Sequence, residues 1–532
     1  MTNVAFRDVT IRQRQARGAT SITSDRRRDE TYVIMCFMAP RREQGAERSS
    51  TGQPLRAAVI GAGMAGILAV IRLREAGIDD VVCFEKADDL GGTWRENTYP
   101  GIACDVPSHV YSYSFAPNPD FSRMFSPGAE IQDYLHRVAL DHGVLDVVRF
   151  GDEVRTMNYD DGGWSITTTS GEQGRFDVVI AATGVLHHPR MPEIEGIDRF
   201  EGAIFHSARW DHDVDLAGRR VGIVGTGSTA IQITGAVVDE VAHLSLFQRT
   251  PQWVMPADNG VIPPEQRAEY REHPERLREL REFLETSFAE NFADAVVDAD
   301  SAELAKIEDI CRANLEQHVT DPELRRRLTP DYRAACKRLV VSGDFYTAIQ
   351  RPNAALVTTA IDRIEESGIR TVDGTLHELD VIVLATGFRV DRFVRPIELT
   401  GVNGRSLDDA WADGPLAYLS VAIPGFPNLF LLNGPNGPVG NFSLIQVAEI
   451  QMDYVLELIA LLRNGSATAI EARADATAAF EAERVAAAQR TVWVTGCNSW
   501  YLDGRGVPAA WPWPFKRFRE VMAEPDLSAF KF

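Results

Sequence analysis

The sequence predicts an α/β fold with two domains of the same type and a helical insertion in the second. Two observations support this prediction. An apolar run, a glycine-rich turn and an amphipathic stretch follow one another twice, from residue 57 and again from residue 221. Residues 263–330 are dense in Glu, Arg, Leu and Ala at helical spacing. Strands that alternate with helices are typical of parallel sheets covered by helices.

The first repeat has the pattern of a dinucleotide-binding turn. Apolar residues 57–60 precede the turn, and a second apolar run, 81–84, ends in an acid. The defining residues are Gly61, Gly63, Gly66 and Glu85. In such a turn the three glycines permit a tight bend, let the backbone approach a pyrophosphate, and let helix and strand pack closely. The acid accepts hydrogen bonds from a ribose diol, so the repeat predicts a Rossmann-like domain.

The second repeat differs at the position that recognises the ribose. Its turn residues are Gly225, Gly227, Ser228, Thr229 and Ala230. Its second strand is followed by Arg249 and Thr250, with no acid. A guanidinium pairs with a ribose 2′-phosphate that a carboxylate would repel, which favours NADPH over NADH. The alternative, that Arg249 is a solvated charge at a strand end, stays open.

Two dinucleotide sites in one chain indicate hydride transfer from a nicotinamide to a flavin. We therefore assign the first domain to FAD and the second to NADPH. The six cysteines are Cys36, Cys83, Cys104, Cys311, Cys336 and Cys497. None forms a CxxC pair, so the pattern indicates no disulfide framework, no metal site and no redox dithiol, and it favours a reducing cytoplasm. Electrons would then pass to oxygen.

Charge and hydropathy exclude several partners. The net charge of −21 gives an acidic surface that repels nucleic acid and anionic lipid. The longest apolar stretch, near residues 455–462, is too short to span a membrane. The composition therefore predicts a cytoplasmic protein without a membrane span.

The predicted domains alternate along the chain. A pair of similar apolar runs, 176–184 and 379–387, each end in Ala-Thr-Gly and read as buried strands. The predicted boundaries are 1–52 for a disordered extension, 53–190 for the first part of the FAD domain, 191–215 for a linker, 216–262 for the first part of the NADPH domain, 263–330 for the insertion, 331–379 for the second part of the NADPH domain, and 380–532 for the second part of the FAD domain with a C-terminal loop.

The linker carries the most specific motif. It reads FxGxxxHxxxW followed by Asp, with Phe200, Gly202, His206 and Trp210 at the fixed positions. With this motif the chain resembles the Baeyer–Villiger monooxygenases, which are class B flavoprotein monooxygenases. Further similar segments are Gly91–Trp94, Asn97–Asp105, Cys336–Leu339, Ala385–Phe388 and Ser499–Trp500. The tail after Trp500 lacks the form of cyclic-ketone enzymes and is closer to the aryl-ketone (4-hydroxyacetophenone monooxygenase-like) branch.

The resemblance implies an activity that uses FAD, NADPH and O₂. A C4a-peroxyflavin would attack a small hydrophobic ketone, and an ester or lactone would leave. Two alternatives stay open: a flavin-containing monooxygenase acting on sulfur or nitrogen, and an NADPH oxidase. Neither the ketone nor the oligomeric state follows from the sequence.

The resemblance also assigns roles to residues. Arg338 and Asp105 would be catalytic, the arginine by stabilising negative charge and the aspartate by holding it. His206 would couple domain positions rather than transfer a proton. The FAD set is Gly61, Gly63, Gly66, Glu85, Gly92, Thr93, Trp94 and Asp105. The NADPH set is Gly225, Gly227, Ser228, Thr229, Arg249, Thr250, Lys337 and Trp500. The loop 433–442 would border the substrate pocket.

Overall fold

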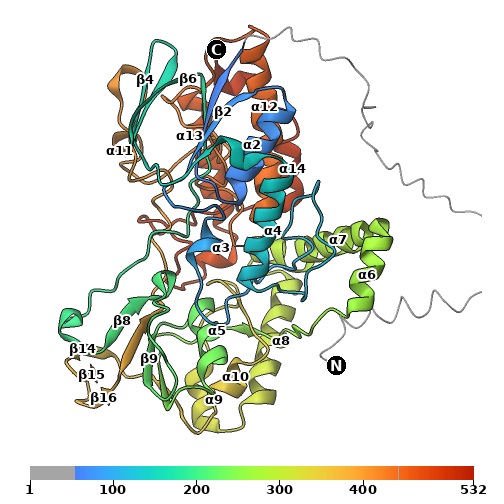
Figure 1. The fold of residues 1–532 in the computed structure, drawn as a ribbon. Helices are drawn as coiled ribbons and strands as arrows, with labels where there is room; N and C mark the ends of the chain where they lie inside the picture. The colour runs from blue at the N-terminus through green and yellow to red at the C-terminus, as the bar shows by residue number, and fades with distance from the viewer. Residues whose placement is uncertain (1–53, 441) are drawn as a thin grey trace, which may run out of the picture. The chain divides into compact units, whose positions relative to one another are not determined.

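The computed structural model describes residues 54–532, apart from Asn441. The predicted extension, residues 1–52, lies outside the described residues. Within residues 54–532, helices and strands alternate as an α/β fold, shown in Figure 1.

A five-stranded parallel sheet forms the core of the first domain. The strand order is β19 (Leu429–Leu431), β7 (Val178–Ala181), β1 (Arg56–Ile60), β2 (Asp80–Phe84) and β3 (Val148–Arg149). Helices α2 (Met64–Glu75), α4 (Gly128–Asp141) and α12 (Leu444–Arg463) belong to this domain, with α2 against α12 (Figure 1). Because the central strands are covered on both faces, they are continuous apolar runs.

A second parallel sheet has the same plan. Its order is β13 (Ala354–Val357), β10 (His243–Phe247), β9 (Arg220–Val224), β17 (Val381–Leu384) and β8 (Ala203–His206). In the first sheet β1 lies between β7 and β2, and in the second sheet β9 lies between β17 and β10. In both cases the strand before the glycine turn is flanked by the strand after the turn's helix and by the strand that leads into Ala-Thr-Gly. The paired sequence runs at 176–184 and 379–387 therefore reflect equivalent positions. Helices α5 (Ser228–Val237) and α10 (Phe345–Ala348) pack together in this domain.

Two predicted boundaries need correction. The boundary predicted after residue 379 assigns β17 to the FAD domain, but β17 pairs with β8 and β9 in the second sheet. The predicted linker, 191–215, contains β8, which forms the edge of that sheet. A short strand that is buried on both faces has the same apolar pattern in either sheet, so pairing depends on tertiary contacts that the pattern does not contain.

Smaller sheets and short elements connect these cores. One sheet contains β18 (Glu398–Thr400), β4 (Val154–Asp160), β5 (Gly163–Thr168) and β6 (Gly171–Phe176), and another contains β14 (Ile361–Glu365), β15 (Gly368–Thr371) and β16 (Leu376–Glu378). The remaining strands are β11 (Val254–Met255), β12 (Val340–Val341), β20 (Glu471–Ala472) and β21 (Phe530–Lys531). The remaining α-helices are α3 (Thr93–Glu96), α11 (Leu407–Ala410), α13 (Ala474–Ala488) and α14 (Phe515–Val521). Single turns of 3₁₀ helix are η1 (Val144–Val147), η2 (Ile197–Arg199), η3 (Ser207–Arg209), η5 (Ala295–Val297), η6 (Val402–Gly404), η7 (Val492–Val494) and η8 (Leu527–Ala529).

The predicted insertion is helical and contacts both cores. It contains α6 (Pro264–Glu272), α7 (Pro274–Phe288), the π-helical turn η4 (Ala289–Ala293), α8 (Ala302–His318) and α9 (Pro322–Leu328). Leu284 of α7 joins the hydrophobic core of the first domain, whereas Leu315 of α8 joins that of the second. The buried Arg281 strengthens the first contact, since its Nη1 donates to the carbonyl of Ser112 at 2.9 Å.

We expect the free energy of unfolding to fall as the pH drops from 6.5 towards 4, partly because of His109. This ring is 3% exposed, packs edge-on against Tyr270 of α6, and its nitrogens have no hydrogen-bond partner within the described residues. Burial, aided by the charge of Arg281, lowers its pKa to about 4. Below pH 6.5 the unfolded chain gains a proton that the folded chain does not bind, which costs about 1.4 kcal/mol per pH unit.

Urea unfolding of the holoenzyme at pH 7 and pH 5 checks this expectation. Between these two pH values, the free energy of unfolding of His109→Phe should fall by about 2 kcal/mol less than that of the wild type. His273→Phe, at an exposed histidine of the same region, is the matched control and should follow the wild type. Equal losses in His109→Phe and the wild type would contradict the assignment to His109.

The cysteines contradict the sequence-based prediction. Cys336 and Cys497 form a disulfide across 161 residues, with their Cα atoms 6.2 Å apart. Cys83, Cys104 and Cys311 are free and buried. The inference of a reducing compartment depended on the lack of a disulfide and therefore loses its basis. Among the helices of residues 54–532, none is long and apolar enough to cross a membrane.

Candidate active site

Both glycine turns open onto one cleft of about 1350 Å³. Every residue of the two predicted cofactor sets lines this cleft except Gly66, and Arg338 lines it as well. The turns lie at the carboxyl ends of β1 and β9, which is where open parallel sheets bind ligands. The structure therefore brings together residues that lie more than 400 positions apart in the chain, from Gly61 to Trp500.

The first turn has the backbone that its glycines predict. Gly61 has φ +98°, and a Cβ there would lie 2.8 Å from the carbonyl oxygen of Ala182. A Cβ on Gly66 would lie 1.8 Å from the carbonyl oxygen of Gly61, so only glycine lets α2 pack on β1. Gly63 precedes α2 directly and lies against Gly92, whose Cα would be 3.6 Å from a Cβ on Gly63. The free N–H groups at the start of α2 thus face space in which a pyrophosphate fits.

Glu85 directly follows β2, and its carboxylate is fixed by the backbone. One oxygen accepts a hydrogen bond from the N–H of Ala62 at 2.8 Å, and the other accepts from Ala87 at 2.9 Å. The side chain is 6% exposed and lines the cleft. A carboxylate oxygen accepts more than one hydrogen bond, so these contacts leave lone pairs for a ribose diol.

The neighbouring glycine pair lies on the same side of the cleft. Gly92 has φ +54° and approaches Gly63, and it precedes α3, which contains Thr93 and Trp94. The indole N–H of Trp94 donates to the hydroxyl of Tyr111 at 3.2 Å, which orients the ring. These contacts hold a second backbone segment beside the first turn, and together they form the walls of a dinucleotide site.

The second turn leaves more room at its middle glycine. Gly225 has φ +123°, and its Cβ would lie 2.3 Å from the carbonyl oxygen of Ala385. Nothing lies within 4 Å of a Cβ on Gly227, which precedes Ser228 and Thr229 at the start of α5. The departure from glycine at Ala230 is accommodated, because this small side chain is fully buried. The open space at Gly227 is suited to a close approach by a pyrophosphate.

Two cations, Arg249 and Lys337, lie next to the second turn. Arg249 follows β10, and Lys337 comes from the segment after α9. Both line the cleft, and burial lowers the pKa of Lys337, with the charge of Arg249 lowering it further and that of Asp331 acting to raise it. In the described part of the chain no ion pair involves Arg249 or Lys337. Thr226 donates to the carbonyl of Thr250 at 2.8 Å and fixes this corner.

Arg338 and Asp105 form a bidentate ion pair inside the cleft. Nε of the arginine donates to Oδ2 at 3.0 Å, and Nη2 lies 2.6 Å from Oδ1. Burial alone would lower the pKa of Arg338, but Asp105 and Tyr501 outweigh it and raise that pKa above its ordinary value. Arg338 therefore stays a cation, and within the described residues its Nη1 has no acceptor.

Comparison with known proteins agrees with this geometry. Residues 55–266 match the flavin-binding monooxygenase-like family. An uncharacterized monooxygenase of Mycobacterium tuberculosis is 49% identical over 89% of this chain and 95% of its own, and a Baeyer–Villiger monooxygenase of Streptomyces coelicolor is 41% identical over 91% and 94%. The chain belongs to the Baeyer–Villiger monooxygenases. A solved steroid monooxygenase bound to NADP is 32% identical, with a TM-score of 0.80 over 90% of this chain and 99% of its own. The prediction of an FAD- and NADPH-dependent enzyme is thus confirmed.

The fingerprint of the Baeyer–Villiger monooxygenases lies outside the cleft. Gly202 precedes β8, and a Cβ there would lie 2.4 Å from the carbonyl oxygen of Asp380. Phe200 and Trp210 pack at either end of the same strand. The buried His206 accepts a hydrogen bond from the N–H of Ala208, and its other nitrogen lies 3.1 Å from the carbonyl oxygen of Gly387. Both nitrogens of His206 are thus engaged in backbone contacts.

Sequence reasoning missed Tyr501, whose electrostatics are coupled to the Arg338–Asp105 ion pair. Tyr501 stacks on Trp500 with their ring centroids 4.1 Å apart. Burial raises the pKa of Tyr501 to about 12, with Arg338 acting to lower it and Asp105 to raise it. Its hydroxyl also lies where a Cβ on Gly440 would be, 1.9 Å away. The adjacency of Tyr501 to Trp500 was the one signal available in the sequence.

Proposed function

We propose that this enzyme inserts one oxygen atom of O₂ beside the carbonyl of a hydrophobic ketone and releases an ester or lactone. The observation that supports this proposal is the Arg338–Asp105 pair in the same cleft as both dinucleotide turns. Oxygen insertion next to a carbonyl places negative charge on oxygen, and a fixed cation stabilises that charge. A heteroatom oxygenation or an oxidase reaction has no such requirement for a held guanidinium.

The residues of the first turn would hold FAD, and those of the second would hold NADPH. When bound, the flavin supplies the redox chemistry, since it accepts hydride from the nicotinamide and transfers electrons to O₂. Asp105 holds two of the N–H groups of Arg338, which fixes the direction of the guanidinium. The unpaired Nη1 is then available to donate to the oxygen of the ketone as it becomes negative. Because the geometry exists before substrate arrives, little reorganisation accompanies the reaction.

Arg249, Lys337 and Thr250 would recognise the 2′-phosphate. A phosphate between the two cations would relieve their mutual repulsion, which a cofactor without the phosphate would leave in place. Trp500 is 38% exposed on the cleft, so its indole would pack on the nicotinamide side of the bound cofactor. These assignments make NADPH the expected reductant.

The loop 433–442 would form the ketone pocket. Val439, Gly440 and Phe442 line the cleft next to Leu432. The side chains of Leu432, Val439 and Phe442 carry no hydrogen-bonding groups and would bind the apolar part of a ketone, while Asn433 is the polar residue of this loop that lines the cleft.

The decisive experiment is the mass of the product formed from NADPH, ¹⁸O₂ and a set of ketones with one sulfide. The set should contain cyclic, linear and aryl ketones. We expect an ester or lactone that carries one heavy oxygen. A labelled sulfoxide without any ester would favour heteroatom oxygenation, and unchanged substrate with hydrogen peroxide would favour an oxidase. Either of those results would overturn the proposed reaction.

A further inference from the structure

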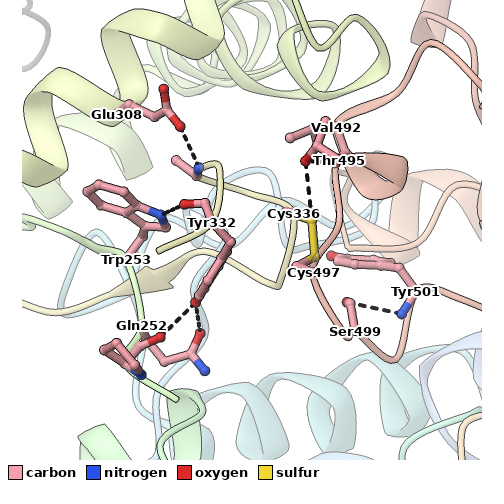
Figure 2. Close-up of a disulfide and its surroundings, with 12 residues drawn as sticks. Gln252, Trp253, Glu308, Tyr332, Cys336, Val492, Thr495, Cys497, Ser499 and Tyr501 are labelled. Atoms are coloured by element: carbon pink, nitrogen blue, oxygen red, sulfur yellow. Dashed lines mark hydrogen bonds between the residues drawn. A yellow bond between two sulfur atoms is a disulfide. The ribbon is translucent and has the colours of Figure 1, made fainter. Parts of the chain in front are cut away.

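The disulfide joins the two segments that flank the cleft. Cys336 precedes Lys337 and Arg338, and Cys497 lies three residues before Trp500. Figure 2 shows the sulfur–sulfur bond connecting these two stretches of coil, with Ser499 and Tyr501 on the C-terminal side. The bond therefore links the candidate catalytic arginine directly to the loop that carries Trp500.

The segment that contains Cys336 is also fixed to the stretch Arg249–Pro251, where the 2′-phosphate would bind. The hydroxyl of Tyr332 donates to the carbonyl of Pro251 at 2.8 Å, and the indole N–H of Trp253 donates to the carbonyl of Tyr332 at 2.6 Å (Figure 2). Pro251 directly follows Thr250, beside Arg249. Arg249, Lys337 and Arg338 are thus held as one unit by hydrogen bonds and by strand pairing of β11 with β12.

The loop of Trp500 has no comparable attachment. Among the described residues, the hydrogen bonds of residues 496–500 all end within residues 499–502. Thr495 donates to Sγ of Cys336 at 3.6 Å, a weak contact to the disulfide itself (Figure 2). Apolar packing of Trp493 and Tyr501 in the shared core cluster supports the loop from either side. The disulfide is therefore the one strong tie between residues 496–500 and the cation-bearing segment in the described chain.

We propose that the Cys336–Cys497 disulfide is a positioning element for NADPH, and that a dithiol which reduces it weakens NADPH binding. This inference depends on the proposed contact of Trp500 with the cofactor. In the reaction, a thiolate of the dithiol attacks one sulfur and the S–S bond breaks. One cysteine leaves as a thiol, and the other stays joined to the reagent as a mixed disulfide. The second thiol of the reagent then attacks the reagent's own sulfur and releases this cysteine, so that two electrons and two protons pass to the enzyme and the reagent becomes a disulfide.

Loss of the tie affects binding because the loop must then be ordered anew at each binding event. Fixing a residue costs about 1–2 kcal/mol of backbone entropy, so ordering one further residue lowers affinity on the order of 10-fold. FAD would be unaffected, because its turn belongs to the other sheet and none of its predicted contacts lies on residues 496–500. The expected signature is a selective loss of NADP⁺ affinity with FAD retained.

The bond is buried, which determines how it must be tested. Cys336 is 0% and Cys497 6% exposed, so a reagent reaches the sulfurs only when the loop opens. A small surface pocket, lined by Trp253, Tyr332, Arg333 and Thr495 among others, lies beside this region. Serine variants at the two cysteines reproduce the broken tie without depending on access.

The test compares the FAD-loaded wild type, with and without dithiothreitol, with Cys336→Ser/Cys497→Ser and the matched control Cys311→Ser. Cys311 is a free, fully buried cysteine of the same core cluster. Thiol titration in denaturant, flavin absorbance and NADP⁺ titration calorimetry are measured on each. We expect two additional thiols after reduction, unchanged flavin content, and about 10-fold weaker NADP⁺ binding in the reduced and double-serine proteins only.

Three results would overturn the proposal. One is a thiol count that shows no disulfide in the untreated protein, and another is unchanged NADP⁺ affinity in the double-serine protein. A parallel loss of FAD would indicate general destabilisation instead of positioning. Failure of the proposed reaction is seen separately, as an oxidised wild type that binds NADP⁺ but forms no ester from any ketone.

Discussion

Arg338→Ala should retain FAD and form ester about 10²- to 10³-fold more slowly than the wild type, the usual effect of removing one donor to a developing oxyanion. The reason is that Asp105 fixes the guanidinium within the cleft and no other cation of the described chain contacts this aspartate. The rate is measured as kcat for ester formation, alongside NADPH consumption and peroxide release. NADPH oxidation without ester would indicate that only the insertion step is lost.

Two further variants separate charge from folding. Arg338→Lys keeps the cation but loses the two-point contact with Asp105, so we expect an intermediate rate. The double variant Arg338→Ala/Asp105→Asn removes the carboxylate that the single variant leaves unpaired. If both alanine variants bind FAD and still turn over at the wild-type rate, the catalytic assignment is wrong.

Arg249→Ala should weaken NADPH binding by about 1.5–3 kcal/mol, the scale of a hydrogen bond to a charged group, and barely change NADH binding. The selectivity follows because only NADPH carries the 2′-phosphate that Arg249 and Lys337 would share. The measurement is KM for each cofactor under saturating ketone and O₂.

Arg312→Ala provides the matched control. This arginine of α8 lies over the ring of Trp253, which follows Arg249 closely in the sequence, yet Arg312 does not line the main cleft. Its removal should change neither cofactor's KM. Equal losses of NADPH and NADH in Arg249→Ala would refute the 2′-phosphate assignment.

Much of the site is predictable from the sequence because the backbone of each turn has no room for a side chain at certain positions. Gly61, Gly66 and Gly225 stand where a Cβ would strike a carbonyl oxygen, so the spacing of these residues carries the geometry of the turn. Arg338 and Asp105 were predicted only through the resemblance to a family. Nothing in their spacing of 233 residues indicates the ion pair.

The rest depends on contacts that no local pattern encodes. The run Val381–Leu384 is apolar on both faces, so it would suit either sheet, and only its pairing with β9 decides. The disulfide requires that the segment after α9 meet the C-terminal loop, which follows from the packing of a whole cluster of aromatic and aliphatic residues. Tyr501 belongs to the same cluster.

The chain returns to the first sheet through β19, whereas all five strands of the second sheet lie within the continuous stretch 203–384, so the bounds of a fragment decide whether its sheet is complete. A piece spanning residues 216–379 would carry β9, β10 and β13 but lack β17 and β8. One side of β9 would then present unpaired backbone groups and the buried side chains of Val221 and Ile223 to water, which favours aggregation. A new nicotinamide half could therefore be acquired as one continuous segment that includes residues 203–384, whereas a new flavin half needs the two segments that flank it.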